Sequence, residues 1–134
     1  SRKVEGTPFD FREFKEIGRD IEADYEQLKL TGGYDHCFCL NDFGKGCRLA
    51  ASVKCEKSGL CLDVFTDLPG VQLYTGNFLS GTVGKGGKPM NHRTGFCLET
   101  QYYPDSPNKP QFPSCYVKAG EVFFTKTSYR VYRY

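Results

Sequence analysis

Turn-forming residues divide this chain into short segments, and their spacing constrains the fold more than any other feature. The sequence has 15 Gly and 7 Pro among 134 residues. Four of the prolines fall in the stretch 104–113, where they exclude a helix or a central strand. The aromatic fraction of 15%, carried by Phe and Tyr without any Trp, favours strands. The chain is therefore expected to fold as short strands joined by many turns.

One helix is expected, between Gly18 and Gly32. Ile21, Tyr25 and Leu28 stand at positions i, i+4 and i+7 and would share one face of it. The glycines that follow would end this helix after two or three turns.

Elsewhere the hydrophobic pattern has a period of two, as in strands with one solvated face. The stretch 48–56 alternates in this way, with Leu49, Ala51, Val53 and Cys55 on one face. A turn at 57–59 and a returning strand at 60–66 predict a β-hairpin. Further strands are expected at 71–74, 95–101 and 121–134, the last with Phe123, Thr125, Thr127, Tyr129 and Val131 on one face. A glycine-rich stretch at 81–94 predicts a surface loop, and the pattern as a whole predicts an antiparallel all-β fold resembling a sandwich.

Charge and cysteine content narrow the class of protein. The formal net charge is +2, too balanced to predict binding to nucleic acid or to an anionic membrane, and no apolar run is long enough to span a bilayer. Seven cysteines cannot all form disulfides within the chain, and none forms a C-x-x-C pair. We therefore expect a cytoplasmic protein with reduced thiols and no metal site.

Three polar residues are candidates for a functional site. Glu99 lies in an apolar strand segment, where it could act as a general base. The alternative is a carboxylate on the solvated face of the strand, and the pattern alone favours this alternative. Asp35 follows Gly32 and Gly33, which let the backbone approach another group closely, although an ordinary turn aspartate has the same surroundings. Gln72 alternates with Val71 and Leu73, so it is either part of a site or simply a polar residue on the exposed face.

The order of four motifs resembles the aldose 1-epimerase (galactose mutarotase) family. The two clearest are G-V-Q-L-Y-T-G-N-F-L at 70–79 and G-F-C-L-E-T-Q at 95–101. The segments G-T-P-F-D-F at 6–11 and G-G-Y-D-H at 32–36 resemble two further motifs, and residues 112–113 and the closing aromatic strand resemble the family's C-terminus. The resemblance covers essentially the whole chain.

This resemblance implies a fold and a chemistry. Members have a large antiparallel β-sandwich, a galactose mutarotase-like supersandwich, and interconvert the α and β anomers of free aldohexoses such as galactose and glucose without metal or organic cofactor. By motif position, Glu99 would be the general base, and Asp35 and Gln72 would bind the sugar. His36 and His92 do not match the family's catalytic histidines, one of which is the general acid. We expect His36 to be a packed, hydrogen-bonded side chain.

The resemblance also implies that residues 1–134 form the C-terminal portion of one sandwich domain, since family members are more than twice as long. The catalytic histidines and a sugar-binding arginine would lie upstream, so this chain alone is expected to be inactive. It is also expected to bind its missing N-terminal half or to self-associate through an exposed sheet. Two alternatives stay open: a non-catalytic carbohydrate-binding module, and an all-β scaffold without sugar function.

Overall fold

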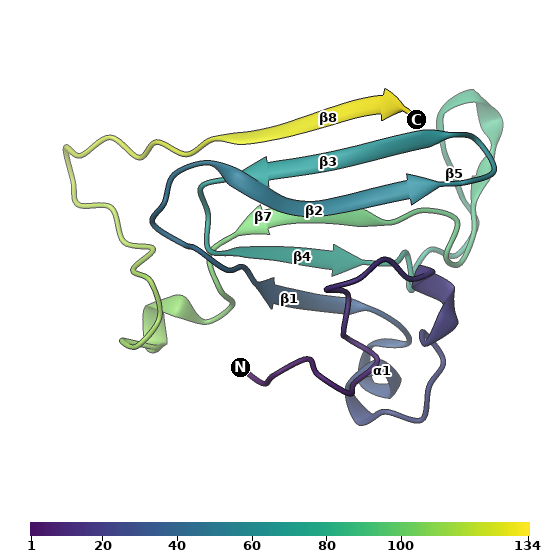
Figure 1. Ribbon diagram of the computed structural model, residues 1–134, viewed down its shortest axis with the longest axis horizontal. Coiled ribbons are helices and arrows are strands. Elements are labelled where there is room, and N and C mark those ends of the chain that lie inside the picture. Colours follow the sequence, from purple (N-terminus) through teal and green to yellow (C-terminus); the bar gives the residue numbers. More distant parts are fainter. The chain divides into compact units, whose positions relative to one another are not determined.

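The computed structural model describes residues 1–134 and consists mainly of strands (Figure 1). The strands are β1 (Asp35–Cys39), β2 (Arg48–Cys55), β3 (Leu60–Thr66), β4 (Gly70–Tyr74), β5 (Thr82–Val83), β6 (Pro89–Met90), β7 (Cys97–Gln101) and β8 (Thr127–Arg133). The helical elements are α1 (Glu26–Thr31) and the 3-10 turns η1 (Ile17–Arg19), η2 (Lys85–Gly87) and η3 (Ser106–Asn108). The expected all-β class is confirmed.

The strands form three sheets, with orders β1-β4-β7, β2-β3-β8 and β5-β6. The chain divides into two compact units. The first unit consists of Ser1–His36 and Leu73–Cys97, and the second of Cys37–Gln72 and Leu98–Tyr134. The sheet β2-β3-β8 belongs to the second unit and the hairpin β5-β6 to the first, while the boundary between the units falls within strands β1, β4 and β7.

The expected hairpin is confirmed as β2 and β3, which pair antiparallel from Arg48–Thr66 to Cys55–Leu60. One detail of its predicted face is wrong. A β-bulge separates Leu49 from Ala51, so that Leu49 pairs with Phe65 while Ala51 pairs with Val64. Leu49 therefore does not share the face of Ala51, because one extra residue in a strand reverses the alternation.

The last strand begins later than the sequence predicts. β8 pairs antiparallel with β3 along Leu60–Thr66, and Thr127 is the partner of Thr66, the last residue of β3. Phe123 and Thr125, expected in the strand, precede it and have no strand partner because β3 ends there. The Asp67 carboxylate instead accepts hydrogen bonds from the Thr125 hydroxyl (2.6 Å) and the Lys126 amide (3.1 Å).

The helix is also shorter than predicted. α1 spans only Glu26–Thr31, because Tyr25 has extended backbone angles (φ −132°, ψ 126°). Ile21 and Leu28 are both buried as expected, but only Leu28 is part of the helix, while Ile21 lies in the turn before it. At the other end, Gly32 (φ 64°) ends the helix and confirms the predicted glycine stop.

Few apolar side chains are fully enclosed. The buried ones are Ile21, Leu28, Tyr34, Cys61, Val64, Leu68, Val71 and Leu73. Large apolar side chains that are more than half exposed include Phe14, Leu30, Leu49, Phe78, Val83, Tyr116, Val122, Phe123, Phe124, Tyr129, Val131 and Tyr134. These exposed side chains are found in both units.

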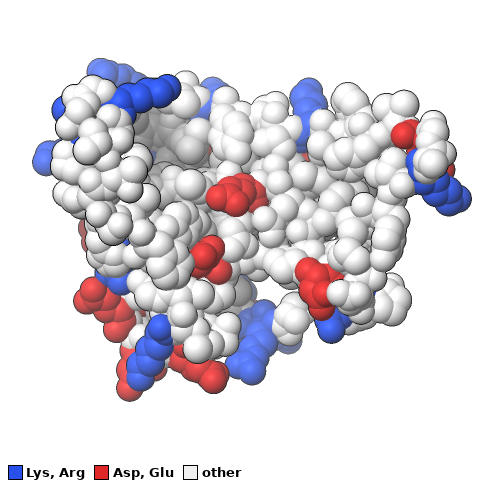
Figure 2. All heavy atoms as spheres, turned by 180° about the vertical axis from the view of Figure 1, so that it is seen from behind, with Lys and Arg blue, Asp and Glu red and all other residues white.

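The remaining surface carries charges of both signs. On the face shown in Figure 2, basic and acidic side chains are scattered among uncharged atoms and form no stripe of one sign. None of the helices is long and apolar enough to cross a membrane.

Candidate functional site

The three candidate residues lie on the strands of the sheet β1-β4-β7. Asp35 is the first residue of β1, Gln72 the central residue of β4, and Glu99 the central residue of β7. Gln72 and Glu99 belong to the second unit and Asp35 to the first.

In the second unit, Gly70 identifies the face of β4 from which Gln72 projects. A Cβ atom placed on Gly70 would lie 2.8 Å from Sγ of Cys37 and 3.2 Å from Cδ1 of Tyr103. The Cys37 thiol and the Tyr103 ring thus occupy the space that a side chain at Gly70 would fill. Gln72 follows Gly70 by two residues and shares this face, because side chains alternate along a strand.

Gln101 places Glu99 on the same face. Gln101 hydrogen-bonds the Cys37 thiol, whose pKa is raised by burial and only partly lowered again by this bond. Since Cys37 lies over Gly70, Gln101 and its i−2 neighbour Glu99 point to the face of Gly70 and Gln72.

The other face of β7 is directed toward β8. The Tyr129 hydroxyl donates to the carbonyl of Leu98 (2.8 Å), and the hydroxyls of Thr100 and Thr127 lie 2.6 Å apart. Leu98 and Thr100 are half-buried, whereas Glu99 between them is exposed. The second unit therefore presents a carboxylate and a carboxamide from neighbouring strands on one side, groups that can accept and donate hydrogen bonds to a ligand rich in hydroxyls.

In the first unit, the two glycines Gly32 and Gly33 precede Tyr34 and Asp35. Gly33 has φ 142°, and a Cβ atom there would lie 2.3 Å from Oδ1 of Asn77. The predicted close approach of another group to this backbone is confirmed, and the group is the Asn77 carboxamide. Sequence reasoning assigned no role to Asn77. The signal that could have identified it is its position directly after Gly76 in the motif at 70–79.

A buried network then fixes Tyr34, the residue before Asp35. Asn77 Nδ2 donates to the Tyr34 carbonyl (2.8 Å), and the Thr75 hydroxyl donates to Asn77 Oδ1 (2.7 Å). The Tyr34 amide donates to Thr75 Oγ1 (3.1 Å). Every polar group of this cluster is paired, so the backbone that leads into Asp35 has one defined course.

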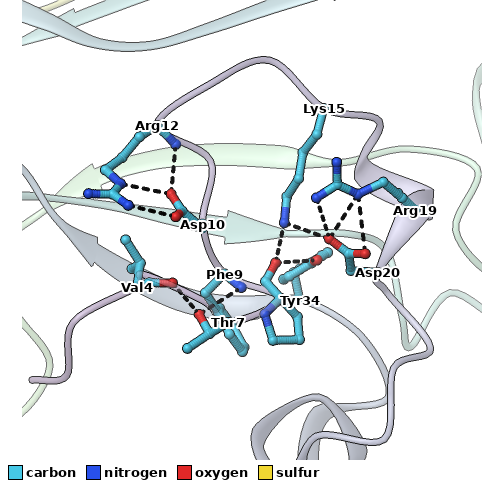
Figure 3. A network of polar contacts seen from close by, with 10 residues as sticks. Val4, Thr7, Phe9, Asp10, Arg12, Lys15, Arg19, Asp20 and Tyr34 are labelled. Atoms are coloured by element: carbon cyan, nitrogen blue, oxygen red, sulfur yellow. Dashed lines mark hydrogen bonds and ion pairs between the residues drawn. The ribbon is translucent and has the colours of Figure 1, made fainter.

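The N-terminal segment holds the Tyr34 side chain from the other end (Figure 3). The carbonyl of Pro8 accepts hydrogen bonds from the Tyr34 hydroxyl (2.9 Å) and from Nζ of Lys15 (2.5 Å), which also pairs with Asp20 (2.9 Å). The Lys15 side chain is only 3% exposed. Burial raises the pKa of Tyr34 to about 12. Sequence reasoning missed this network, because Lys15 and Asp20 are five residues apart in a stretch without regular pattern.

A shallow hollow of about 450 Å³ lies beside this network. It is lined by Asp10, Arg12, Glu13, Phe14, Lys15 and Arg19. Its cations already have carboxylate partners: Arg12 binds Asp10 and Arg19 binds Asp20 (Figure 3). These arginines lower the pKa of Asp10 and of Asp20 to about 2. Lys15 is likewise paired with Asp20, so each of the three cations that line the hollow already has a carboxylate partner.

No group of three or more His, Cys, Asp or Glu side chains is arranged to hold a metal ion. All seven cysteines are free thiols, and they range from exposed to buried.

Comparison with known proteins gives concordant results. Residues 1–130 match the family model described as aldose 1-epimerase. The chain is 41% identical to the aldose 1-epimerase of Escherichia coli over 131 residues, which are 96% of this chain and 38% of that protein. It is 45% identical to the galactose mutarotase of Rattus norvegicus over 121 residues, 90% of this chain and 34% of that protein. The crystal structure of the GalM/aldose epimerase homologue from C. elegans superimposes with a TM-score of 0.82 at 25% identity, covering 98% of this chain and 38% of that one.

Proposed function

Because the chain belongs to the aldose 1-epimerase family, we propose that it supplies the general base and part of the sugar-binding surface of an aldohexose mutarotase. The observation that carries this proposal is the family match over residues 1–130, joined to the common face of Gln72 and Glu99. The expected products are the interconverted α and β anomers of free sugars such as galactose and glucose.

Glu99 acts as the general base in this proposal. Its carboxylate removes the proton from the C1 hydroxyl of the sugar while an acid donates a proton to the ring oxygen, and the bond between C1 and that oxygen breaks to give the open-chain aldehyde. Rotation about the C1–C2 bond and closure on the other face give the second anomer. Two groups are needed because one must be deprotonated and the other protonated at the same pH.

Asp35 and Gln72 bind sugar hydroxyls in this proposal. A carboxylate accepts hydrogen bonds only, whereas a carboxamide both accepts and donates. Asp35 precedes Cys37 by two residues on β1, so strand alternation gives both side chains the same side of that strand. The role of Asp35 in this proposal rests on its position in the G-G-Y-D-H motif at 32–36, within the region that matches the family model.

The general acid lies outside these 134 residues in this proposal. The chain spans only 34% to 38% of the length of the relatives with which it was compared. We propose that the remaining part of the family fold supplies the acid and covers the exposed apolar side chains, and that the chain otherwise self-associates. Either partner would remove from water the apolar surface that the chain alone exposes. The cytoplasm remains the proposed location.

A chimeric enzyme tests this function. Residues 1–130, which match the family model, would replace the corresponding region of the Escherichia coli aldose 1-epimerase, to which the chain is 41% identical. Polarimetry of freshly dissolved α-D-glucose and α-D-galactose should show anomer interconversion well above the spontaneous rate. A folded chimera that binds either sugar without converting it would support the carbohydrate-binding alternative. A folded chimera that neither binds nor converts sugars would contradict both.

A further inference from the structure

His36 follows Asp35 on β1 and projects from the other side of the strand. Its ring packs edge-to-face against Phe9, with centroids 4.6 Å apart and an interplanar angle of 74°. The expectation that His36 is a packed, hydrogen-bonded histidine is confirmed, and its hydrogen bond is the informative feature.

The Asp35 backbone N–H donates to Nδ1 of His36 at 3.0 Å. Nδ1 can accept this bond only when it carries no proton, so the neutral ring has its hydrogen on Nε2. The side chain of one residue thus fixes the peptide unit from which the neighbouring carboxylate projects.

The ring is itself held by the N-terminal segment. Phe9 packs against Tyr34 at 5.4 Å and against Tyr25 at 5.6 Å. Phe9 follows Pro8, whose carbonyl is the acceptor for Lys15 and Tyr34 (Figure 3). A continuous set of contacts therefore runs from the buried lysine through Phe9 to the imidazole.

We propose that His36 is a positioning residue for Asp35: its neutral imidazole accepts the Asp35 amide and holds the carboxylate in the orientation that binds a sugar hydroxyl. The second part rests on the proposed function of Asp35. The first part concerns the chain alone and can be tested without any sugar.

Protonation should break this arrangement. An imidazolium carries hydrogens on both nitrogens, so it cannot accept the Asp35 N–H. Burial lowers the pKa of His36, and the Asp35 carboxylate opposes this by stabilising the charged ring. The N-terminal segment contacts the ring through Phe9, which carries no charge. The charged side chains of this segment, Lys15 and Asp20, pair with each other. The hydrogen bond should therefore persist at neutral pH and be lost in acid, below the ordinary imidazole value of about 6.5.

Two variants separate the hydrogen bond from the packing. His36→Asn keeps an acceptor oxygen near the position of Nδ1 but does not titrate. His36→Phe keeps an aromatic ring against Phe9 but has no acceptor. The amide signal of Asp35 in a ¹⁵N-labelled 134-residue chain would be followed by NMR from pH 7.5 to 4.5.

The wild-type amide proton should resonate downfield at pH 7.5 and move upfield as His36 titrates. In His36→Asn the downfield position should persist without that step. In His36→Phe the signal should lie upfield at every pH, and its hydrogen exchange should be at least about fivefold faster, as expected for one lost neutral hydrogen bond. If His36→Phe does not fold, the difference between wild type and His36→Asn decides alone. An Asp35 signal with the same pH dependence in those two proteins would overturn the proposal.

Sugar binding provides the second readout. Galactose affinity, measured at pH 7.5 by titration of the chimera with and without the same substitutions, should fall about fivefold in His36→Phe and stay within about twofold in His36→Asn. If the isolated chain shows the amide behaviour but the folded parent chimera binds no sugar, the positioning of Asp35 is supported and its proposed function is contradicted. Equal galactose affinity in all three proteins would refute the link between His36 and binding.

Discussion

Replacing Gly33 by alanine should strongly destabilise the segment that leads into Asp35. Gly33 has φ 142°, which a residue with a side chain adopts only at a cost of about 1–3 kcal/mol. The new Cβ would also lie 2.3 Å from Oδ1 and 2.9 Å from Cγ of Asn77, so that the carboxamide must move.

The displaced carboxamide would lose two buried hydrogen bonds, one to the Tyr34 carbonyl and one from the Thr75 hydroxyl. Each contributes about 1 kcal/mol. Together with the backbone cost, the free energy of unfolding should fall by about 3–5 kcal/mol. A decrease of that size is a large part of the total stability of an ordinary domain, about 5–15 kcal/mol.

Urea denaturation followed by circular dichroism measures this loss, and Gly120→Ala is the matched control. Gly120 also has positive φ (87°), but no atom lies within 4 Å of the position of its Cβ. Its substitution should cost only the backbone term, about 1 kcal/mol or slightly more. In an Asn77→Ala background, Gly33→Ala should likewise cost little more than the control. A single Gly33→Ala variant within about 1 kcal/mol of Gly120→Ala would refute the steric argument.

Arg48, Tyr34 and the cysteines each give a further prediction. The Arg48 guanidinium donates to the carbonyls of Asn41 (2.8 Å), Thr66 (3.0 Å) and Leu68 (3.1 Å). Arg48→Ala should therefore lower the free energy of unfolding by about 2 kcal/mol, and Arg48→Lys should recover less than half of that loss. Equal stability of the three proteins in urea would contradict this. Since the pKa of Tyr34 is raised to about 12 in the folded chain, its contribution to stability should be complete below pH 10 and lost as the pH rises toward 12. In a titration of tyrosinate absorbance, Tyr34→Phe should remove a step at high pH, and an unchanged titration curve would disprove this. Thiol titration of the unfolded, unreduced chain should find seven free groups, and three or fewer would refute the expectation of reduced cysteines.

The parts of the fold that sequence predicts well are those decided by neighbouring residues. The hairpin of β2 and β3 follows from period-two alternation on both sides of a tight turn, and Gly32 ends α1 because it adopts a left-handed conformation without strain. The start of β8 could not be predicted in this way. It depends on where the partner strand β3 ends, at Thr66, and the residues before Thr127 alternate equally well.

The candidate site shows the same division. The motif positions single out Glu99, Gln72 and Asp35, but the common face of Glu99 and Gln72 depends on a contact between Gln101 and Cys37, from two different strands, over the bare Gly70. The roles of Asn77 and Lys15 depend on partners far along the chain or in irregular backbone. Local sequence periodicity cannot predict such contacts, so only the folded structure reveals them.

The most direct test of the proposed general base is the turnover number of Glu99→Gln in the active chimera, measured by polarimetry with α-D-glucose. Glutamine keeps the shape of the side chain but cannot take a proton, so kcat should fall by about 10²-fold or more while KM changes little. Glu56→Gln, at an exposed position beside the hairpin turn, is the matched control and should retain full activity. A Glu99→Gln enzyme whose kcat stays within about threefold of the parent would contradict the assignment, because a lost general base costs far more.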